Sequence, residues 1–158
     1  IREFVIVQVL GRDLSLTDRT EIWNLVLAAG TNPLLGAGYY SFWLGPRAEQ
    51  IWMDRPGINQ SHNGYIEAYI NGGVAAIALL VFFLIWIRRS QSKAMSLDSK
   101  FGVFGYSILI VALVHNYSEA TFFRMSLLWF LLVLLSFGVR AREAPKAPAN
   151  KGYTKAIR

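Results

Sequence analysis

The stretch IEAYINGGVAAIALLVFFLIWI, residues 66–87, decides the fold class of this chain. A membrane-spanning helix needs about 20 mostly apolar residues to cross roughly 30 Å of hydrocarbon. This stretch supplies them, with an unbroken apolar run from Val74 to Ile87. The arginine pair at positions 88 and 89 follows directly and ends the run. We therefore expect a transmembrane helix over residues 66–87.

The composition of the whole chain agrees with a membrane protein. Of its 158 residues, 54% are apolar and only 16% are charged, which is too few charges for an ordinary soluble domain of this size. The chain has no cysteine, so disulfides and thiolate metal sites are excluded. Because it begins at Ile1, we expect it to be the C-terminal portion of a longer polytopic protein, inactive by itself.

Two weaker apolar segments follow the first. Residues 101–115 and 125–139 are mostly apolar but short for spans, and polar residues separate them over the turn 116–124. Residues 88–100 then form a loop, and the Pro-, Ala- and Lys-rich tail 140–158 is expected to be disordered. The sequence thus predicts an all-α polytopic membrane protein with three C-terminal transmembrane helices after a large loop.

The charges of the connecting segments predict the orientation. Segment 88–100 carries a net charge of +3 and the tail 140–158 one of +5, whereas the loop 1–65 carries −1. Because Lys- and Arg-rich short loops stay in the cytoplasm, we expect the loop 1–65 and the turn 116–124 to face the periplasm from a bacterial inner membrane. The net charge of +6 then reflects topology and contact with membrane lipids. Nucleic acid is not an expected partner, since the basic residues form no single patch.

The loop 1–65 contains signals for one helix. Asp18 as an N-cap and Glu21 in the first turn predict a helix that begins near position 18. Gly30 can end this helix, and Asn32-Pro33 prevents its continuation.

The rest of the loop is rich in glycine and aromatic residues. Residues 36–40 favour a flexible aromatic loop, and Trp43 and Trp52 are interpreted as interfacial anchors. Residues 1–10 are apolar but too few to cross a membrane.

Five segments carry a family resemblance. In order they are Leu10-Gly11-Arg12-Asp13, Leu16-Thr17-Asp18-Arg19-Thr20-Glu21-Ile22-Trp23, Asn32-Pro33-Leu34-Leu35-Gly36-Ala37-Gly38, Ser61-His62-Asn63-Gly64-Tyr65, and Asn116-Tyr117-Ser118-Glu119 followed by Trp129. Together they resemble the O-antigen ligase/polymerase family, and within it the exopolysaccharide-production branch. One departure is Asp18, where the family usually has glycine. Its carboxylate lies beside Arg19 in the sequence and can pair with it.

The resemblance implies a function. Members of this family are polytopic glycosyltransferases of the GT-C type. The implied donor is a glycan on polyprenyl pyrophosphate at the periplasmic face, and the implied acceptor is a hydroxyl of a glycan or a lipid. Transfer would need no nucleotide sugar, no metal and no other cofactor.

The residues of the matching segments fit this chemistry. Pyrophosphate is a good leaving group whose negative charge arginine can stabilise. The acceptor hydroxyl needs a base, and histidine is the side chain best poised near neutral pH. We therefore expect Arg19 and Arg12 to bind the pyrophosphate, and His62 and Glu119 to be catalytic.

Each of these residues also has a structural interpretation that the sequence leaves open. His62 can cap the first span. Arg19 can pair with Glu21 on the loop helix, an exposed arrangement that contributes little. Glu119 can pair with Arg124 at the membrane boundary.

Two other functions remain open. The chain can belong to a transporter of lipid-linked polysaccharide, or to a non-catalytic membrane component of an exopolysaccharide assembly system. A transporter is expected to place ionisable groups along its spans, whereas the polar groups here gather outside the apolar runs. The sequence does not separate a polymerase from a ligase.

Overall fold

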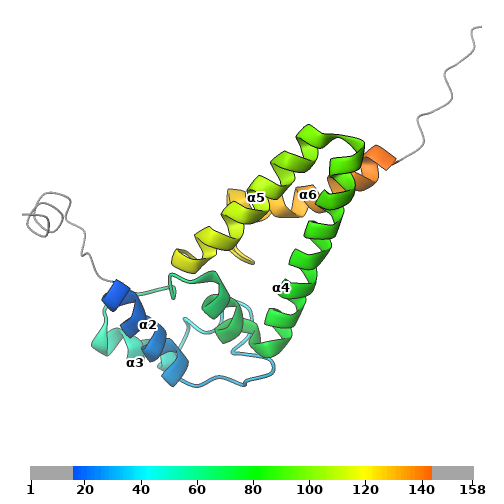
Figure 1. Cartoon of the computed structure of the whole chain (residues 1–158). Coiled ribbons are helices and arrows are strands. Elements are labelled where there is room, and N and C mark those ends of the chain that lie inside the picture. Colours follow the sequence, from blue (N-terminus) through cyan, green and yellow to red (C-terminus); the bar gives the residue numbers. More distant parts are fainter. Residues whose placement is uncertain (1–15, 144–158) are drawn as a thin grey trace, which may run out of the picture.

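Helices and connecting loops make up the structure (Figure 1). The computed structural model describes residues 16–143, with side chains from position 19 to position 137. Its helices, in order, are α2 (Leu16–Ala28), α3 (Pro46–Asp54), α4 (Gly64–Leu97), α5 (Ser99–Ser118) and α6 (Leu127–Glu143). No β-strand occurs among these described residues, so the expected all-α class is confirmed for this part of the chain.

The three C-terminal helices pack against one another. Helix α4 is the longest element, α5 returns beside it, and α6 contacts both (Figure 1). Their shared core contains Leu80 and Ile87 of α4, Leu109 of α5 and Leu132 of α6, each at most 5% exposed. Helices α2 and α3 lie at the end of the molecule where α4 begins and α5 ends. The candidate site lies at this same end.

Helix α4 does not end at the arginine pair. It continues to Leu97, and only Asp98 separates it from α5. Asp98 caps the N-terminus of α5, because its side chain accepts a hydrogen bond from the Lys100 N–H (3.1 Å). The segment 88–100, expected to be a loop, is therefore helical apart from Asp98. The reason is that residues 88–97 contain no glycine or proline, and Arg, Lys, Gln and Ala are good helix formers. The charges end the apolar run without ending the helix.

Helix α4 is broken at Gly73. The backbone there has φ 61° and ψ −159°, a combination that glycine adopts and other residues avoid. Four backbone hydrogen bonds with the preceding loop replace those lost at the break. The N–H groups of Val74 and Ala75 donate to the carbonyls of Pro33 (2.9 Å) and Leu34 (3.1 Å). The N–H groups of Ala37 and Gly38 donate to the carbonyls of Ile70 and Asn71, both at 2.9 Å. A break in an apolar helix needs such partners, because hydrocarbon offers none.

Among the residues that the structure describes, two helices, α4 and α5, are long and apolar enough to cross a membrane. Only 22% and 28% of their most apolar windows are buried within the described chain, so most of this apolar surface faces outward, as in a membrane protein. The apolar part of α6 is Leu127–Phe137, which is shorter than a span. All of α6 extends roughly 26 Å at about 1.5 Å per residue. The third span, expected over 125–139, stays a prediction.

The turn between α5 and α6 begins later than expected. Residues 116–118 are the last residues of α5, and the buried Asn116 organises the chain that follows. Its Oδ1 accepts from the N–H groups of Thr121 (2.9 Å) and Phe122 (3.0 Å). Helix α6 runs to Glu143, so the tail predicted from position 140 begins inside this helix. The rest of the tail lies outside the described residues.

The N-terminal loop has an apolar core of its own. Its buried members are Ile22, Val26, Phe42, Trp43, Ile51 and Ile70. Trp43 was expected to be an interfacial anchor, but it is 7% exposed and belongs to this core. The loop is therefore a folded unit packed on the first part of α4.

The loop helices agree in part with the sequence. Helix α2 is described from Leu16, so Asp18 lies inside it and is not its cap. Its predicted end is confirmed, because Gly30 has φ 64°. Helix α3 was not predicted. Its available signals were Pro46 in the first turn and Glu49 three residues later, both favoured at helix N-termini.

Candidate functional site

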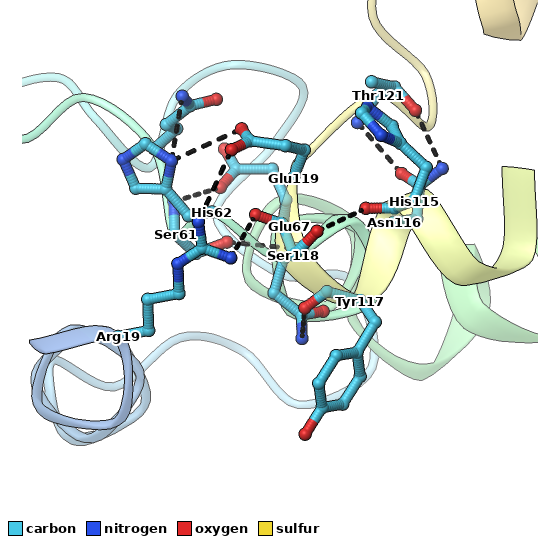
Figure 2. A network of polar contacts seen from close by, with 12 residues as sticks. Arg19, Ser61, His62, Glu67, His115, Asn116, Tyr117, Ser118, Glu119 and Thr121 are labelled. Carbon is cyan, nitrogen blue, oxygen red and sulfur yellow. Dashed lines mark hydrogen bonds and ion pairs between the residues drawn. The ribbon is translucent and has the colours of Figure 1, made fainter. Parts of the chain in front are cut away.

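Three of the four residues singled out from the sequence lie together. Arg19 comes from α2, His62 from the residues before α4, and Glu119 from the residues after α5 (Figure 2). Glu119 lies between the other two. Its Oε1 is 3.7 Å from Arg19 Nη2, and its Oε2 is 3.4 Å from His62 Nδ1. We call this group the Arg19–His62–Glu119 cluster. Arg12 lies outside the described residues.

The cluster is accessible from outside. The side chains of Arg19 and His62 are each 34% exposed, and that of Glu119 is 40% exposed. Ion pairs this exposed contribute only about 0–1 kcal/mol to stability, so the cluster is not explained as a device that holds the fold together. An imidazole, a carboxylate and a guanidinium that lie together and partly exposed can take part in proton transfer and in anion binding.

A tight turn holds His62 in place. Its φ is 51°, a left-handed conformation that costs residues other than glycine about 1–3 kcal/mol. The neighbouring residues enforce this turn. Trp23 Nε1 donates to the Ser61 carbonyl, and Ser61 Oγ donates to the Asn63 carbonyl, both at 2.9 Å. Asn63, and not His62, caps α4, because its Oδ1 accepts from the N–H of Tyr65 (3.0 Å).

The backbone of Glu119 joins α5 to α4. Its N–H donates to the His115 carbonyl (2.9 Å), and its carbonyl accepts from the Gly64 N–H (3.1 Å). The approach is close, since a Cβ added to Gly64 would lie 2.0 Å from Asn116 Oδ1. The start of α4 and the end of α5 are thus locked together, which explains how residues 57 positions apart meet.

Arg19 makes a second contact with the end of α5. Its Nη1 donates to the Ser118 carbonyl at 2.8 Å, beside the Glu119 carboxylate. The alternative pairing with Glu21 is not found, because Glu21 pairs with Arg55. The described polar contacts of Arg19 are therefore with Ser118 and Glu119 at the end of α5, and not with residues of its own helix.

The alternative partner for Glu119 is also not found. Arg124 pairs with Glu67, with Nη2 at 3.3 Å from Oε1, and its guanidinium lies 5.5 Å from the centre of the Tyr40 ring. The second histidine, His115, lies exposed in the last turn of α5 and outside the cluster.

Glu67 is a polar residue that the sequence reasoning missed. Its side chain is only 6% exposed, and its oxygens accept from Trp43 Nε1 (2.8 Å) and from the Ser61 N–H (2.9 Å). Glu67 stands at the start of an apolar segment, where a carboxylate is costly unless it is paired. That position was the signal that could have identified it.

Gln60 was also missed. Its Oε1 accepts from Arg124 Nη1 (2.9 Å), and its Nε2 lies 3.3 Å from His62 Nδ1. Nothing in its sequence context distinguishes Gln60 from other loop residues. Its place is visible only once the turn that carries His62 is folded against Arg124.

A pocket of about 320 Å³ lies beside Arg124. Aromatic rings and aliphatic side chains form most of its wall, and the Glu67–Arg124 pair forms its charged edge. A second, more open pocket of about 520 Å³ shares Arg124 with it and extends along α6. The first pocket is lined by Leu35, Gly38, Tyr39, Tyr40, Glu67, Ala68, Asn71, Gly72, Ala76, Leu79, Phe122, Phe123 and Arg124. Such a pocket suits an amphipathic ligand.

The described residues contain no group of three His, Asp or Glu side chains placed to bind a metal ion. The side chains of the cluster can supply proton transfer at an imidazole and charge stabilisation by a guanidinium.

Comparison with known proteins gives one informative match. Over 99 residues, 34% are identical to those of the exopolysaccharide production protein ExoQ of Rhizobium meliloti (strain 1021). The chain is similar to an exopolysaccharide production protein. The match covers 58% of this chain and 22% of ExoQ, so the chain spans about a fifth of that relative. This match agrees with the exopolysaccharide-production branch, which the five sequence segments resemble. No family model and no solved structure matches the chain.

Proposed function

We propose that this chain is part of a membrane glycosyltransferase that transfers or polymerises a glycan from polyprenyl pyrophosphate onto an acceptor hydroxyl at the periplasmic face. The observation that carries the proposal is the convergence of Arg19, His62 and Glu119 at the end of an apolar helix pair. The similarity to an exopolysaccharide production protein supports it.

In this proposal His62 is the base. The acceptor hydroxyl attacks the anomeric carbon of the donor sugar, and its proton passes to His62 Nε2. The Nδ1 atom faces Glu119 at 3.4 Å, so a proton on Nδ1 leaves the lone pair of Nε2 free. A carboxylate beside Nδ1 also stabilises the imidazolium that forms, as in other His–carboxylate pairs. Glu119 then orients and stabilises His62 and does not take the proton itself.

Arg19 is the proposed partner of the leaving group. The bond between the anomeric carbon and the pyrophosphate oxygen breaks as the acceptor bond forms, and polyprenyl pyrophosphate leaves with its negative charge. A guanidinium can hold two phosphate oxygens at once. Its contact with Glu119 is long, at 3.7 Å, which favours exchange of this contact for a phosphate.

The pocket beside Arg124 is the proposed place for an apolar part of a substrate. Its walls are aromatic and aliphatic, and it lies next to the turn that carries His62, with Gln60 linking the two. A lipid-linked donor has this amphipathic character.

The direct test uses the complete protein in membranes. A glycan on polyprenyl pyrophosphate and a glycan acceptor are supplied together, and both the product and the released polyprenyl pyrophosphate are measured. The proposal predicts that product and released carrier appear in equal amounts. Movement of the intact lipid-linked glycan across the membrane, without cleavage, would indicate a transporter instead.

A further inference from the structure

The buried carboxylate Glu67 reaches His62 through the backbone. Its Oε2 accepts from the N–H of Ser61 at 2.9 Å, and Ser61 is completely buried directly before His62. The His62 backbone is in a left-handed conformation that non-glycine residues rarely adopt. A buried acceptor on the preceding peptide keeps the turn in this conformation.

Glu67 also reaches His62 through two side chains. It pairs with Arg124, which in turn donates to Gln60 Oε1 at 2.9 Å. Because a guanidinium only donates hydrogen bonds, this contact assigns the orientation of the Gln60 amide. The amide Nε2, a donor, must then face His62 Nδ1, 3.3 Å away. The charge on Glu67 thereby acts on His62 indirectly: it holds Arg124, and Arg124 sets which end of the Gln60 amide faces His62 Nδ1.

His62 Nδ1 therefore lies between two partners with opposite requirements. Glu119 can only accept, so it favours a proton on Nδ1 and leaves Nε2 free as a base. Gln60 Nε2 can only donate, so it favours a bare Nδ1 and a proton on Nε2. The balance between these contacts determines how much of the neutral histidine is in the form that can accept a proton.

We propose that Glu67 is a positioning residue for His62, acting through the Ser61 backbone and through Arg124 and Gln60, and that Gln60 opposes Glu119 in selecting the protonated nitrogen of His62. This inference rests on the proposed function, in which His62 is the base. Glu67 itself is too buried to meet the substrate's reacting atoms.

Two variants of the complete protein in membranes test the inference. Glu67→Gln removes the charge that holds Arg124 while keeping the side-chain shape. Gln60→Glu keeps an acceptor for Arg124 but replaces the donor that faces Nδ1 with a carboxylate oxygen. Their matched controls are Glu21→Gln, which removes the α2 carboxylate that pairs with Arg55, and Gln50→Glu, which adds a charge at an exposed position of α3.

The readouts are folded protein, kcat, KM for the lipid-linked donor, and the pH dependence of transfer. The charged groups around the imidazole are Glu119 after α5, Arg19 of α2 beyond it, and the Arg124–Glu67 pair behind Gln60. For Glu67→Gln we expect kcat to fall about 10-fold to 100-fold through misplacement of the base, while KM for the donor reports separately on the pocket that the Glu67–Arg124 pair borders. For Gln60→Glu we expect the midpoint of the acid limb to move up by about half a pH unit or more, because a second carboxylate favours the imidazolium. The controls should leave both readouts unchanged.

The outcomes separate this inference from the proposed function. If Gln60→Glu leaves the pH profile unchanged while His62→Ala is inactive, the positioning is wrong and the base assignment stands. If Glu67→Gln lowers only the amount of folded protein and leaves kcat unchanged, its role is structural and the inference is overturned. If His62→Ala transfers glycan normally, the base assignment itself fails, whatever the Gln60 variant does.

Discussion

His62 Nδ1 lies 3.4 Å from Glu119 Oε2, although the two residues are 57 positions apart in the chain. The contact exists because the Gly64 N–H at the start of α4 donates to the Glu119 carbonyl at the end of α5. Contacts between a base and its orienting carboxylate are often this long before substrate binds. The proposed role of His62 as a base oriented by Glu119 rests on this contact.

Replacing the carboxylate of Glu119 should slow transfer without removing donor binding. In Glu119→Gln the new amide can donate to Nδ1, which places the proton on Nε2 and blocks the base. We expect kcat to fall about tenfold or more, with KM for the donor nearly unchanged. Glu49→Gln, an exposed change on α3, is the matched control. Equal kcat in both variants would show that Glu119 does not act on His62.

Arg19 should tolerate neither alanine nor lysine. A lysine ammonium cannot reproduce a two-point contact with phosphate. A hydrogen bond to a charged group contributes about 1.5–3 kcal/mol, so we expect kcat/KM to fall about 10-fold to 100-fold in both Arg19→Ala and Arg19→Lys. The control is Arg47→Lys, in the same loop but with its guanidinium over the Phe42 ring. Full activity of Arg19→Lys would reduce the role of Arg19 to simple charge pairing.

The break in α4 should depend on glycine at position 73. In Gly73→Ala the new Cβ would lie 2.3 Å from the Leu34 carbonyl carbon, in a backbone conformation that is essentially restricted to glycine. We expect a large loss of folded protein in membranes. Gly57→Ala is the control, because Gly57 also has positive φ but nothing lies within 4 Å of its added Cβ. Equal yields of the two variants would mean that the loop does not need to approach α4 this closely.

The predicted topology is tested by a reporter that is active only in the periplasm. Fused after Arg158, it should be silent, because the basic segments 88–100 and 140–158 favour the cytoplasmic side. Fused into the loop at Gly57, on an exposed turn, it should be active. The opposite pattern would place the Arg19–His62–Glu119 cluster on the cytoplasmic side and contradict a periplasmic donor.

The sequence predicted the composition of the cluster better than the boundaries of the helices. The length of the apolar runs located α4 and α5, but Arg88 and Arg89 end only the apolar run and not the helix. The break at Gly73 depends on hydrogen bonds with residues 33–38. Because these partners lie outside α4, the local sequence of α4 does not predict the break.

Members of the candidate site could be predicted from the sequence where the chemistry of the side chain suggested a role. Arg19, His62 and Glu119 were singled out from the kinds of groups that the proposed reaction needs and from a family resemblance. Gln60 was not predictable, because its contacts with Arg124 and His62 arise only in the folded chain. Glu67 had a signal, a carboxylate at the edge of an apolar run, but its partners Trp43 and Ser61 are set by the folded loop.

The most direct measurement is the rate of glycan transfer by His62→Ala, per folded molecule in membranes, beside His115→Ala. These are the chain's two histidines, and His115 lies exposed at the end of α5, where the account gives it no catalytic role. We expect His62→Ala to bind donor but to lose about 100-fold to 10,000-fold in rate. His115→Ala should keep the wild-type rate and the wild-type pH dependence. A wild-type rate in His62→Ala, with the same pH dependence, would contradict the account.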